Sequence, residues 1–367
     1  MAGVGALFTP FRLGKLVLPN RVVMAPMTRK HSPGGVPGAN VAAYYRRRAA
    51  GGVGLIITEG VGIPHPAALY DTAIPSFHGK AALAGWSRVL AGVRAEGGRI
   101  MPQLWHTGAF RKPGDSPNPE VAPATPSGLF KPGQFVGTPM TQSDIEAVIR
   151  AYAEAAASAQ RLGFDGIEIH AAHGYLIDTF FWDATNLRSD GYNGDLAART
   201  RFAVEVIAAC RAAVGPDFPI LLRFSQWKQQ DYAARLAPTP AALATFLEPM
   251  AAAGVDMLHC STRRFWEPEF AGSALNLAGW AKKLTGLPTI TVGSVGLGAD
   301  ATASFAGARA QVAGLDDHLL PMLERGEFDL VAVGRALLGD PDWTTKIRDG
   351  RDHDLRPFDT ASMKVLA

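Results

Sequence analysis

Short apolar runs and longer segments with helical spacing alternate along the chain. Eight of the runs are continuously hydrophobic, without the strict alternation of a half-exposed strand, which is typical of parallel strands covered on both faces. The predicted strands are residues 21–27, 53–60, 99–105, 164–170, 218–224, 255–261, 287–293 and 328–334. The predicted helices are residues 40–50, 80–96, 143–162, 196–214, 240–253, 276–285 and 315–325, with one more after Pro341.

Cap residues fit these boundaries. The sequence TQSD at 141–144 predicts a capping box, in which Thr141 and Asp144 satisfy each other's backbone amides. Glycines stand where predicted helices must stop: Gly97, Gly98, Gly163, Gly254, Gly286 and Gly326. Eight alternating strand and helix units favour an α/β fold of the (β/α)8 TIM-barrel type over an open sheet.

The domain organisation follows from the absence of any linker-like change in composition. Residues 1–367 are expected to form one domain with a short N-terminal extension. The segment 108–140 is rich in Pro and Gly and lacks clear periodicity. Because long loops in compact domains are usually functional, we expect this segment to be a lid or a substrate-side loop.

Composition narrows the function classes. Hydrophobic residues make up 47% and charged residues 19%, with a formal net charge of +3, so nucleic-acid binding is not expected. The basic run YYRRRAAGG at 44–52 is interpreted as a solvated helix end. Cys210 and Cys260 do not make a disulfide scaffold and are expected to be buried. No signal peptide or apolar span is visible, which predicts a cytoplasmic protein.

Polar residues collect at the predicted carboxyl ends of the strands, where barrels of this class carry their chemistry. The first five strands end at or near Thr28, Glu59 with Gly60, Gln103 with His106, His170 with His173, and Arg223. The last two end in the glycine-rich turns VGSVG and VGRAL, where backbone amides can approach a phosphate closely and Arg335 adds a guanidinium group.

The motif GIEIHAAHGY, with His170, His173 and Tyr175, allows several interpretations. A metal-dependent barrel hydrolase commonly needs a His-x-His pair near the first strand and an Asp after the last, and neither is present. A nicotinamide-binding Rossmann motif is suggested by GLGADA at 296–301 but lacks the acidic residue expected at the end of the next strand. Alternatively, the histidines are neutral donors to a carbonyl oxygen and Tyr175 is a proton donor, which suits reduction of an activated C=C bond.

The third interpretation coincides with a family resemblance. HAAHGYLIDTFF followed by ATNLRSDGYNGDLAARTRF resembles the signature H-x-x-[N/H]-G-Y-L … N-x-R-x-D-x-Y-G-G … R-x-R-F of the old yellow enzymes, which are FMN-dependent ene reductases on a single TIM barrel. The resemblance runs from LFTPFRLGKLVLPNRVVMAPMTR through GLIITEG, QLWHTG and LLRFS to DLVAVGRALLGDPDW, in family order.

The resemblance implies roles for the residues named above. His170 and His173 would hold the substrate carbonyl, and Tyr175 would protonate the α-carbon. NADPH or NADH would reduce FMN, and an activated alkene would then occupy the same place, giving ping-pong kinetics. Thr28 would hydrogen-bond the flavin O4, Gln103 would lie on the pyrimidine edge of the flavin, and Arg223 would lie near its N1 and O2. The isoalloxazine would be lined by Ala25, Pro26, Met27 and Gly60, and the phosphate by Gly293, Ser294, Gly334 and Arg335.

The chain also departs from the family pattern. YNGD at 192–195 replaces the usual Y-G-G-S, and Ala198 stands where Asn is common, both away from the expected flavin contacts. The cysteine cluster and extra domains of the larger relatives are not expected here. A non-catalytic flavin-binding scaffold remains an alternative. A homo-oligomer is left open, with Arg356 in the C-terminal tail as a candidate contact.

Overall fold

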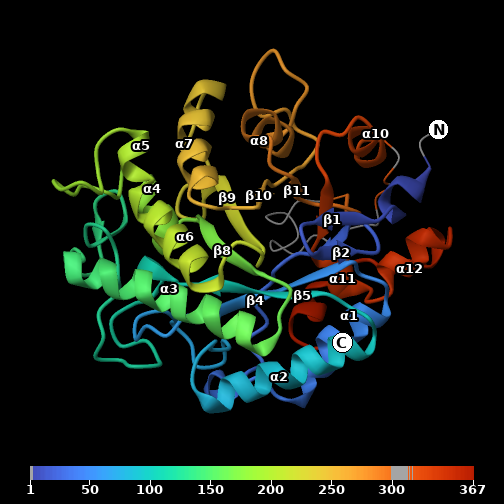
Figure 1. Ribbon diagram of the computed structural model, residues 1–367, viewed down its shortest axis with the longest axis horizontal. Coiled ribbons are helices and arrows are strands. Elements are labelled where there is room, and N and C mark those ends of the chain that lie inside the picture. The colour runs from blue at the N-terminus through green and yellow to red at the C-terminus, as the bar shows by residue number, and fades with distance from the viewer. Residues whose placement is uncertain (1–2, 299–312, 314, 316) are drawn as a thin grey trace.

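The eight predicted strands are all present, and they close into one parallel barrel (Figure 1). The computed structural model describes residues 3–298, 313, 315 and 317–367. In barrel order the strands are β3 (Val22–Met24), β4 (Leu55–Gly62), β5 (Ile100–Trp105), β8 (Ile167–His173), β9 (Ile220–Lys228), β10 (Met257–Ser261), β11 (Thr289–Val292) and β12 (Leu330–Val333). The TIM-barrel prediction is therefore confirmed.

The barrel has an apolar interior that is separate from the core beneath the helices. Its members alternate along the strands, as the pleat requires. Two further strands that the sequence analysis missed, β1 (Phe11–Leu13) and β2 (Leu16–Leu18), form an antiparallel hairpin whose leucines join this inner cluster. The inner cluster comprises Leu16, Leu18, Val23, Ala25, Leu55, Ile57, Met101, Leu221, Met257, Ile290, Val292, Leu330 and Ala332. Apolar residues on both faces explain why the strands lack alternation in sequence.

Helices surround the strands in Figure 1, and most begin and end near their predicted bounds. They are α1 (Ala39–Ala50), α2 (Lys80–Ala95), α3 (Gln142–Leu162), α4 (Leu176–Phe181), α5 (Leu196–Arg199), α6 (Arg201–Val214), α7 (Pro240–Ala252), α8 (Leu277–Thr285), α10 (Leu319–Glu324), α11 (Arg335–Gly339) and α12 (Trp343–Arg348). The capping box of Thr141 and Asp144 is present. Gly163 and Gly286 end their helices with positive φ, as glycine at that position allows.

Two helix predictions need correction, and two short helices were missed. The helix predicted over 196–214 is interrupted at Thr200, which caps both α5 and α6. The helix predicted over 315–325 is described only as α10, and Asp316 lies outside the described residues, as do residues 299–301 of the rejected GLGADA motif. The short helices α4 and α11 were not predicted, because one or two turns give too little periodicity to detect.

The interpretation of the basic run at 44–52 as a solvated helix end is wrong for its innermost arginine. Arg48 is 1% exposed. Its guanidinium lies 3.9 Å from the centroid of the Tyr44 ring and donates to the carbonyl of Leu337 at 3.0 Å. The guanidinium is more weakly hydrated than an ammonium ion and stacks on aromatic faces, so it tolerates this burial.

The segment 108–140 lies beside the barrel mouth and has more structure than its sequence suggests. It contains a short 3-10 helix, η3 (Gly108–Phe110), and an antiparallel pair, β6 (Leu129–Lys131) and β7 (Gln134–Phe135). Its start is held by the buried Arg111, whose guanidinium donates to the carbonyl of Leu69 at 2.5 Å and to that of Asp115 at 2.8 Å.

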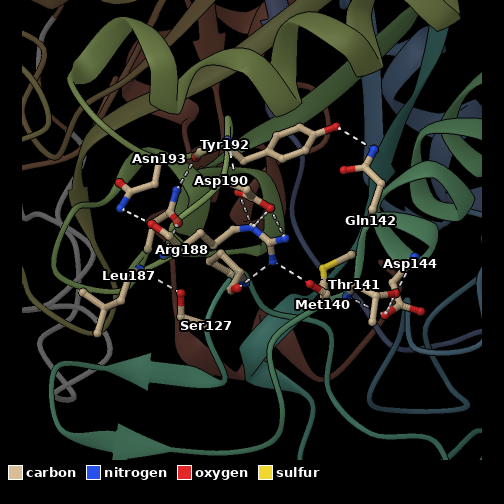
Figure 2. Close-up of polar contacts among 12 residues, drawn as sticks. Ser127, Met140, Thr141, Gln142, Asp144, Leu187, Arg188, Asp190, Tyr192 and Asn193 are labelled. Carbon is tan, nitrogen blue, oxygen red and sulfur yellow. Dashed lines mark hydrogen bonds and ion pairs between the residues drawn. The ribbon is translucent and has the colours of Figure 1, made fainter.

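The end of this segment is clamped by Arg188, which belongs to the NLRSDGYNGD motif (Figure 2). The guanidinium donates to the carbonyls of Pro126 at 3.0 Å and Met140 at 2.5 Å, and it pairs with Asp190 at 2.6 Å. The hydroxyl of Ser127 accepts the amide of Leu187 at 2.7 Å. This motif therefore fixes both ends of the β6–β7 hairpin.

Candidate active site

Two joined cavities open at the carboxyl ends of the barrel strands. The larger has a volume of about 320 Å³ and includes Ala25, Met27, Gly293, Ser294, Gly334 and Arg335 in its lining. The smaller, about 130 Å³, is lined by Pro26, Thr28, Gln103, Trp105, His170, His173, Tyr175 and Arg223. Pro26, His173 and Arg223 line both. The barrel therefore brings nearly all of the sequence-predicted site residues together.

Gly60 is the exception, because it lines neither cavity. A Cβ at this position would lie 2.5 Å from the ring of Trp105. Gly60 thus lets the indole approach β4 closely, and the indole in turn forms a wall of the smaller cavity. The sequence assigned this glycine to the flavin lining, and that role stays a prediction; the contact that the structure shows is with Trp105.

His170 and His173 both lie within β8, which continues three residues beyond the end of the predicted strand at His170. Side chains three apart on a regular strand point to opposite faces. Here the pairing of β8 with β9 shifts register between Ala171 and His173, and His173 adopts a φ of 67°. The irregularity turns His173 back so that both imidazoles line the same cavity.

Both imidazoles are neutral in this environment. Burial lowers the pKa of His170 and of His173 well below the usual range, and the nearby Arg223 guanidinium lowers each further. Nδ1 of His170 accepts the amide of Ala172 at 3.3 Å, so the proton of the neutral ring is on Nε2. Nε2 of His173 lies 2.8 Å from Oγ of Ser261, and its ring stacks on Trp227 with centroids 4.5 Å apart.

Tyr175 lies at the start of α4 with its ring among other aromatic rings. Its centroid is 4.8 Å from that of Trp105, 5.0 Å from that of His170 and 4.6 Å from that of Phe110 in the segment 108–140. Burial raises the pKa of Tyr175, and a hydrogen bond with the side chain of Gln229 opposes this effect. The phenol is therefore protonated at neutral pH, and it lines the same cavity as both histidines.

A layer of buried polar groups lies between the apolar barrel interior and the cavities. Nε2 of Gln103 donates to Oε1 of Glu168 at 2.8 Å, and Nδ1 of His259 lies 2.6 Å from Oε2 of the same carboxylate. Burial lowers the pKa of Arg223, which Glu168 partly restores. Glu168, Ser261 and His259 were not assigned by sequence reasoning. Their signal is a polar residue inside an otherwise apolar strand.

The far end of the larger cavity is suited to an anion. Nη2 of Arg335 lies 3.1 Å from Oγ of Ser294, which has a φ of 59°. A Cβ at Gly293 would lie 2.6 Å from the carbonyl of Thr262, so this turn requires glycine.

These features fit FMN. Nε of the buried Arg223 has no hydrogen-bond partner among the described residues, and the cavity between Arg223 and Arg335 has apolar walls that include Met27 and Ala332. A planar, largely apolar ring with electron-rich oxygens at one end and a phosphate at the other matches this arrangement.

The barrel and the cavities at its mouth are thus suited to a flavin, and comparison with known proteins identifies the family. Residues 6–354 match the model of the NADH:flavin oxidoreductase / NADH oxidase family. The chain belongs to this family, that of the old yellow enzymes, whose cofactors are FMN and a nicotinamide hydride donor.

Named relatives agree with this assignment. The chain is 34% identical over 362 residues to the NADH oxidase of Thermoanaerobacter brockii, covering 95% of this chain and 52% of that protein. It is 38% identical over 224 residues to 12-oxophytodienoate reductase 7 of Oryza sativa subsp. japonica, covering 58% of this chain and 56% of the other. It therefore spans about half the length of the first curated relatives that it matches.

Solved structures are similar over nearly the whole chain. Morphinone reductase in complex with tetrahydroNAD superposes with a TM-score of 0.80 at 29% identity, covering 97% of this chain and 93% of that one. Neither a metal-binding group of three or more His, Cys, Asp or Glu nor a helix able to span a membrane occurs in the part of the chain that the structure describes.

Proposed function

We propose that the chain is an ene reductase, which uses NADPH or NADH to reduce the C=C bond of an α,β-unsaturated carbonyl compound in a ping-pong cycle. The observation that carries this proposal is the position of His170, His173 and Tyr175 on one cavity that joins the larger cavity suited to FMN. When bound, FMN would supply the hydride chemistry between the nicotinamide and the β-carbon of the alkene.

The residues of the chain polarise the alkene and supply its proton. His170 presents its Nε2 proton to the substrate carbonyl, and His173 lies beside it with its ring held against Trp227. Because both rings are neutral and already oriented, they stabilise charge that develops on the oxygen without further reorganisation. The phenol of Tyr175 gives its proton to the α-carbon. Thr28, Gln103 and Arg223 would hold the flavin ring, and Gly293, Ser294, Gly334 and Arg335 its phosphate.

The surroundings of the site support two further parts of the proposal. Phe110 of the segment 108–140 packs on Tyr175, which supports a role for this segment as a substrate-side lid. Cys210 and Cys260 are unpaired and buried, which agrees with a cytoplasmic location, where thiols stay reduced. The names of the relatives, reductases of 12-oxophytodienoate and morphinone, support an unsaturated ketone as the substrate class.

The test is a visible absorption spectrum of the purified protein during two anaerobic additions. Adding NADPH is expected to bleach a bound flavin, and adding a cyclic enone is expected to restore its colour while the saturated ketone forms. A flavin that bleaches but does not recover with any of a panel of enones would contradict ene reduction. A colourless protein that does not take up FMN would favour the scaffold alternative.

A further inference from the structure

The last residue of β9, Lys228, and the two residues after it lie against the segment that leads from β8 into α4. This segment, His173, Gly174 and Tyr175, is here called the proton-donor turn. The backbone amide of Gln229 donates to the carbonyl of His173 at 3.3 Å. Nε2 of Gln230 donates to the carbonyl of Gly174 at 2.9 Å. The side chain of Gln229 hydrogen-bonds the phenol of Tyr175.

Lys228 reaches the same turn through Asp178 on the first turn of α4. Nζ of Lys228 lies 2.6 Å from Oδ1 of Asp178, and Oδ2 accepts the amide of Gly174 at 2.6 Å. The side chains of Lys228 and Asp178 are 1% and 0% exposed. Burial raises the pKa of Asp178, and the Lys228 ammonium opposes this effect.

Stability alone does not account for this pair. Removing two charges from water costs several kcal/mol per ion, and replacing a buried ion pair with neutral groups is often neutral or stabilising. The pair instead fixes the orientation of the proton-donor turn, because it connects this turn to α4 and to β9 at one point. The turn needs such a tie, since His173 has a φ of 67°, a conformation that residues other than glycine rarely adopt.

We propose that Lys228 and Asp178 are positioning residues for the proton transfer, because they hold the proton-donor turn so that the phenol of Tyr175 stays aimed into the substrate cavity. Gln230 supports the turn from the same strand end. The inference rests on the proposed ene reduction. Neither side chain of the pair lines the two cavities, so both act through Tyr175.

The first test is the double variant Asp178→Asn/Lys228→Met, which removes the tether without leaving an unpaired buried charge. The asparagine can still accept the amide of Gly174. A displacement of about 1 Å can cost about a hundredfold in rate, so we expect flavin reoxidation by the enone to slow by about 10- to 100-fold. Flavin reduction by NADPH, which needs no proton from Tyr175, should stay within about twofold, a change below about 0.5 kcal/mol. Equal slowing of both half-reactions would overturn the proposal.

A double-mutant cycle identifies the route of the effect. In a Tyr175→Phe background the same pair substitution should cost no further rate, because residues that act through one group are not additive. A full additional loss in that background would contradict the proposal.

The matched control is Asp329→Asn/Lys282→Met, which removes an ion pair of 3.0 Å at the start of β12 and should leave both half-reactions unchanged. Gln230→Ala is a milder variant that should slow reoxidation in the same direction.

A readout independent of turnover separates this inference from the proposed function. The protein is labelled with 3-fluorotyrosine, and the Tyr175 resonance among the seven tyrosines is identified by its loss in Tyr175→Phe. We expect the ¹⁹F signal of Tyr175 to shift or broaden in the Asp178→Asn/Lys228→Met variant and to be unchanged in the control variant. An unchanged signal would overturn the tether. If the signal changes in the variant but the wild-type protein reduces no enone, the tether formed by Lys228 and Asp178 is supported and only the proposed ene reduction is contradicted.

Discussion

Tyr175 is the residue on which the proposed reaction most directly depends. Its ring is fixed by Trp105, His170 and Phe110, so Tyr175→Phe removes one oxygen and leaves the packing intact. Since general acid catalysis contributes about 10²–10⁴-fold, enone reduction should slow by about that factor, whereas flavin reduction by NADPH should keep its rate. Stopped-flow measurement of each half-reaction checks this. Equal losses in both would remove Tyr175 from the role of proton donor.

Glu59 on β4 makes a pH-dependent contribution to the stability of the folded protein. Its side chain is 1% exposed, and Oε2 accepts the backbone amides of Arg29 at 2.8 Å and Lys30 at 3.3 Å. It therefore holds the turn that follows Thr28. Burial raises the pKa of Glu59 to about 7, although the two amides favour its ionised form. A raised carboxyl pKa means that the folded protein binds this proton more tightly than the unfolded chain does.

The stabilisation that Glu59 provides when protonated is complete below its unfolded pKa of about 4.5 and is lost as the pH rises through its folded pKa of about 7. The difference between the two pKa values corresponds to about 3 kcal/mol of unfolding free energy, at about 1.4 kcal/mol per pKa unit. Glu59→Gln should therefore gain stability relative to the wild type between pH 5 and pH 8, measured by urea unfolding at saturating FMN. Glu146→Gln, on the exposed surface of α3, is the control and should leave the pH dependence unchanged. A Glu59→Gln variant that follows the wild type at both pH values would contradict the shift.

Among the elements, β8 shows how far the sequence determines the site. The continuous apolar run predicted its position, and the motif identified both histidines and Tyr175 as members of one site. The local pattern did not reveal that the strand continues to His173, because the register shift depends on pairing with β9. Glu168 was missed for a similar reason. A carboxylate in an apolar strand has meaning only once Gln103 and His259 are placed beside it.

The guanidinium of Arg188 connects elements that are far apart in the sequence, because it joins the NLRSDGYNGD motif to the ends of the β6–β7 hairpin (Figure 2). A lysine provides one ammonium in place of the planar fork and cannot make all of these bonds. Arg188→Lys should therefore increase proteolysis within 108–140 by about tenfold, which corresponds to about 1.4 kcal/mol of local opening. It should also raise the KM for the enone. Arg150→Lys, on an exposed arginine of α3, is the control. Equal cleavage rates would mean that the clamp does not stabilise the hairpin.

At the scale of the whole molecule, the order of layers along the barrel axis determines where chemistry can occur. The apolar interior reaches up to Val292 and Ala332, and the polar residues Gln103, Glu168, Arg223 and His259 lie above it. This order was only partly predictable. The family motifs indicated the mouth residues, but the sequence did not show that Gly60 serves Trp105 or that Arg48 is buried. The single domain over 1–367 stays a prediction, as does a contact of Arg356 with a neighbouring subunit.

Ligand linkage across the barrel mouth gives a test of the whole molecule. FMN at 100 times its Kd should stabilise the folded chain by about 2.7 kcal/mol, and a single domain should unfold in one transition. Riboflavin lacks the phosphate and should raise the Tm much less. Arg335→Gln should reduce FMN affinity by about tenfold or more, since a hydrogen bond to a charged group contributes about 1.5–3 kcal/mol, and it should leave riboflavin binding unchanged. Arg356→Gln removes the same charge outside both cavities and serves as the control. If Arg335→Gln weakens FMN and riboflavin equally, the phosphate does not lie between Ser294 and Arg335, and that end of the larger cavity needs another occupant.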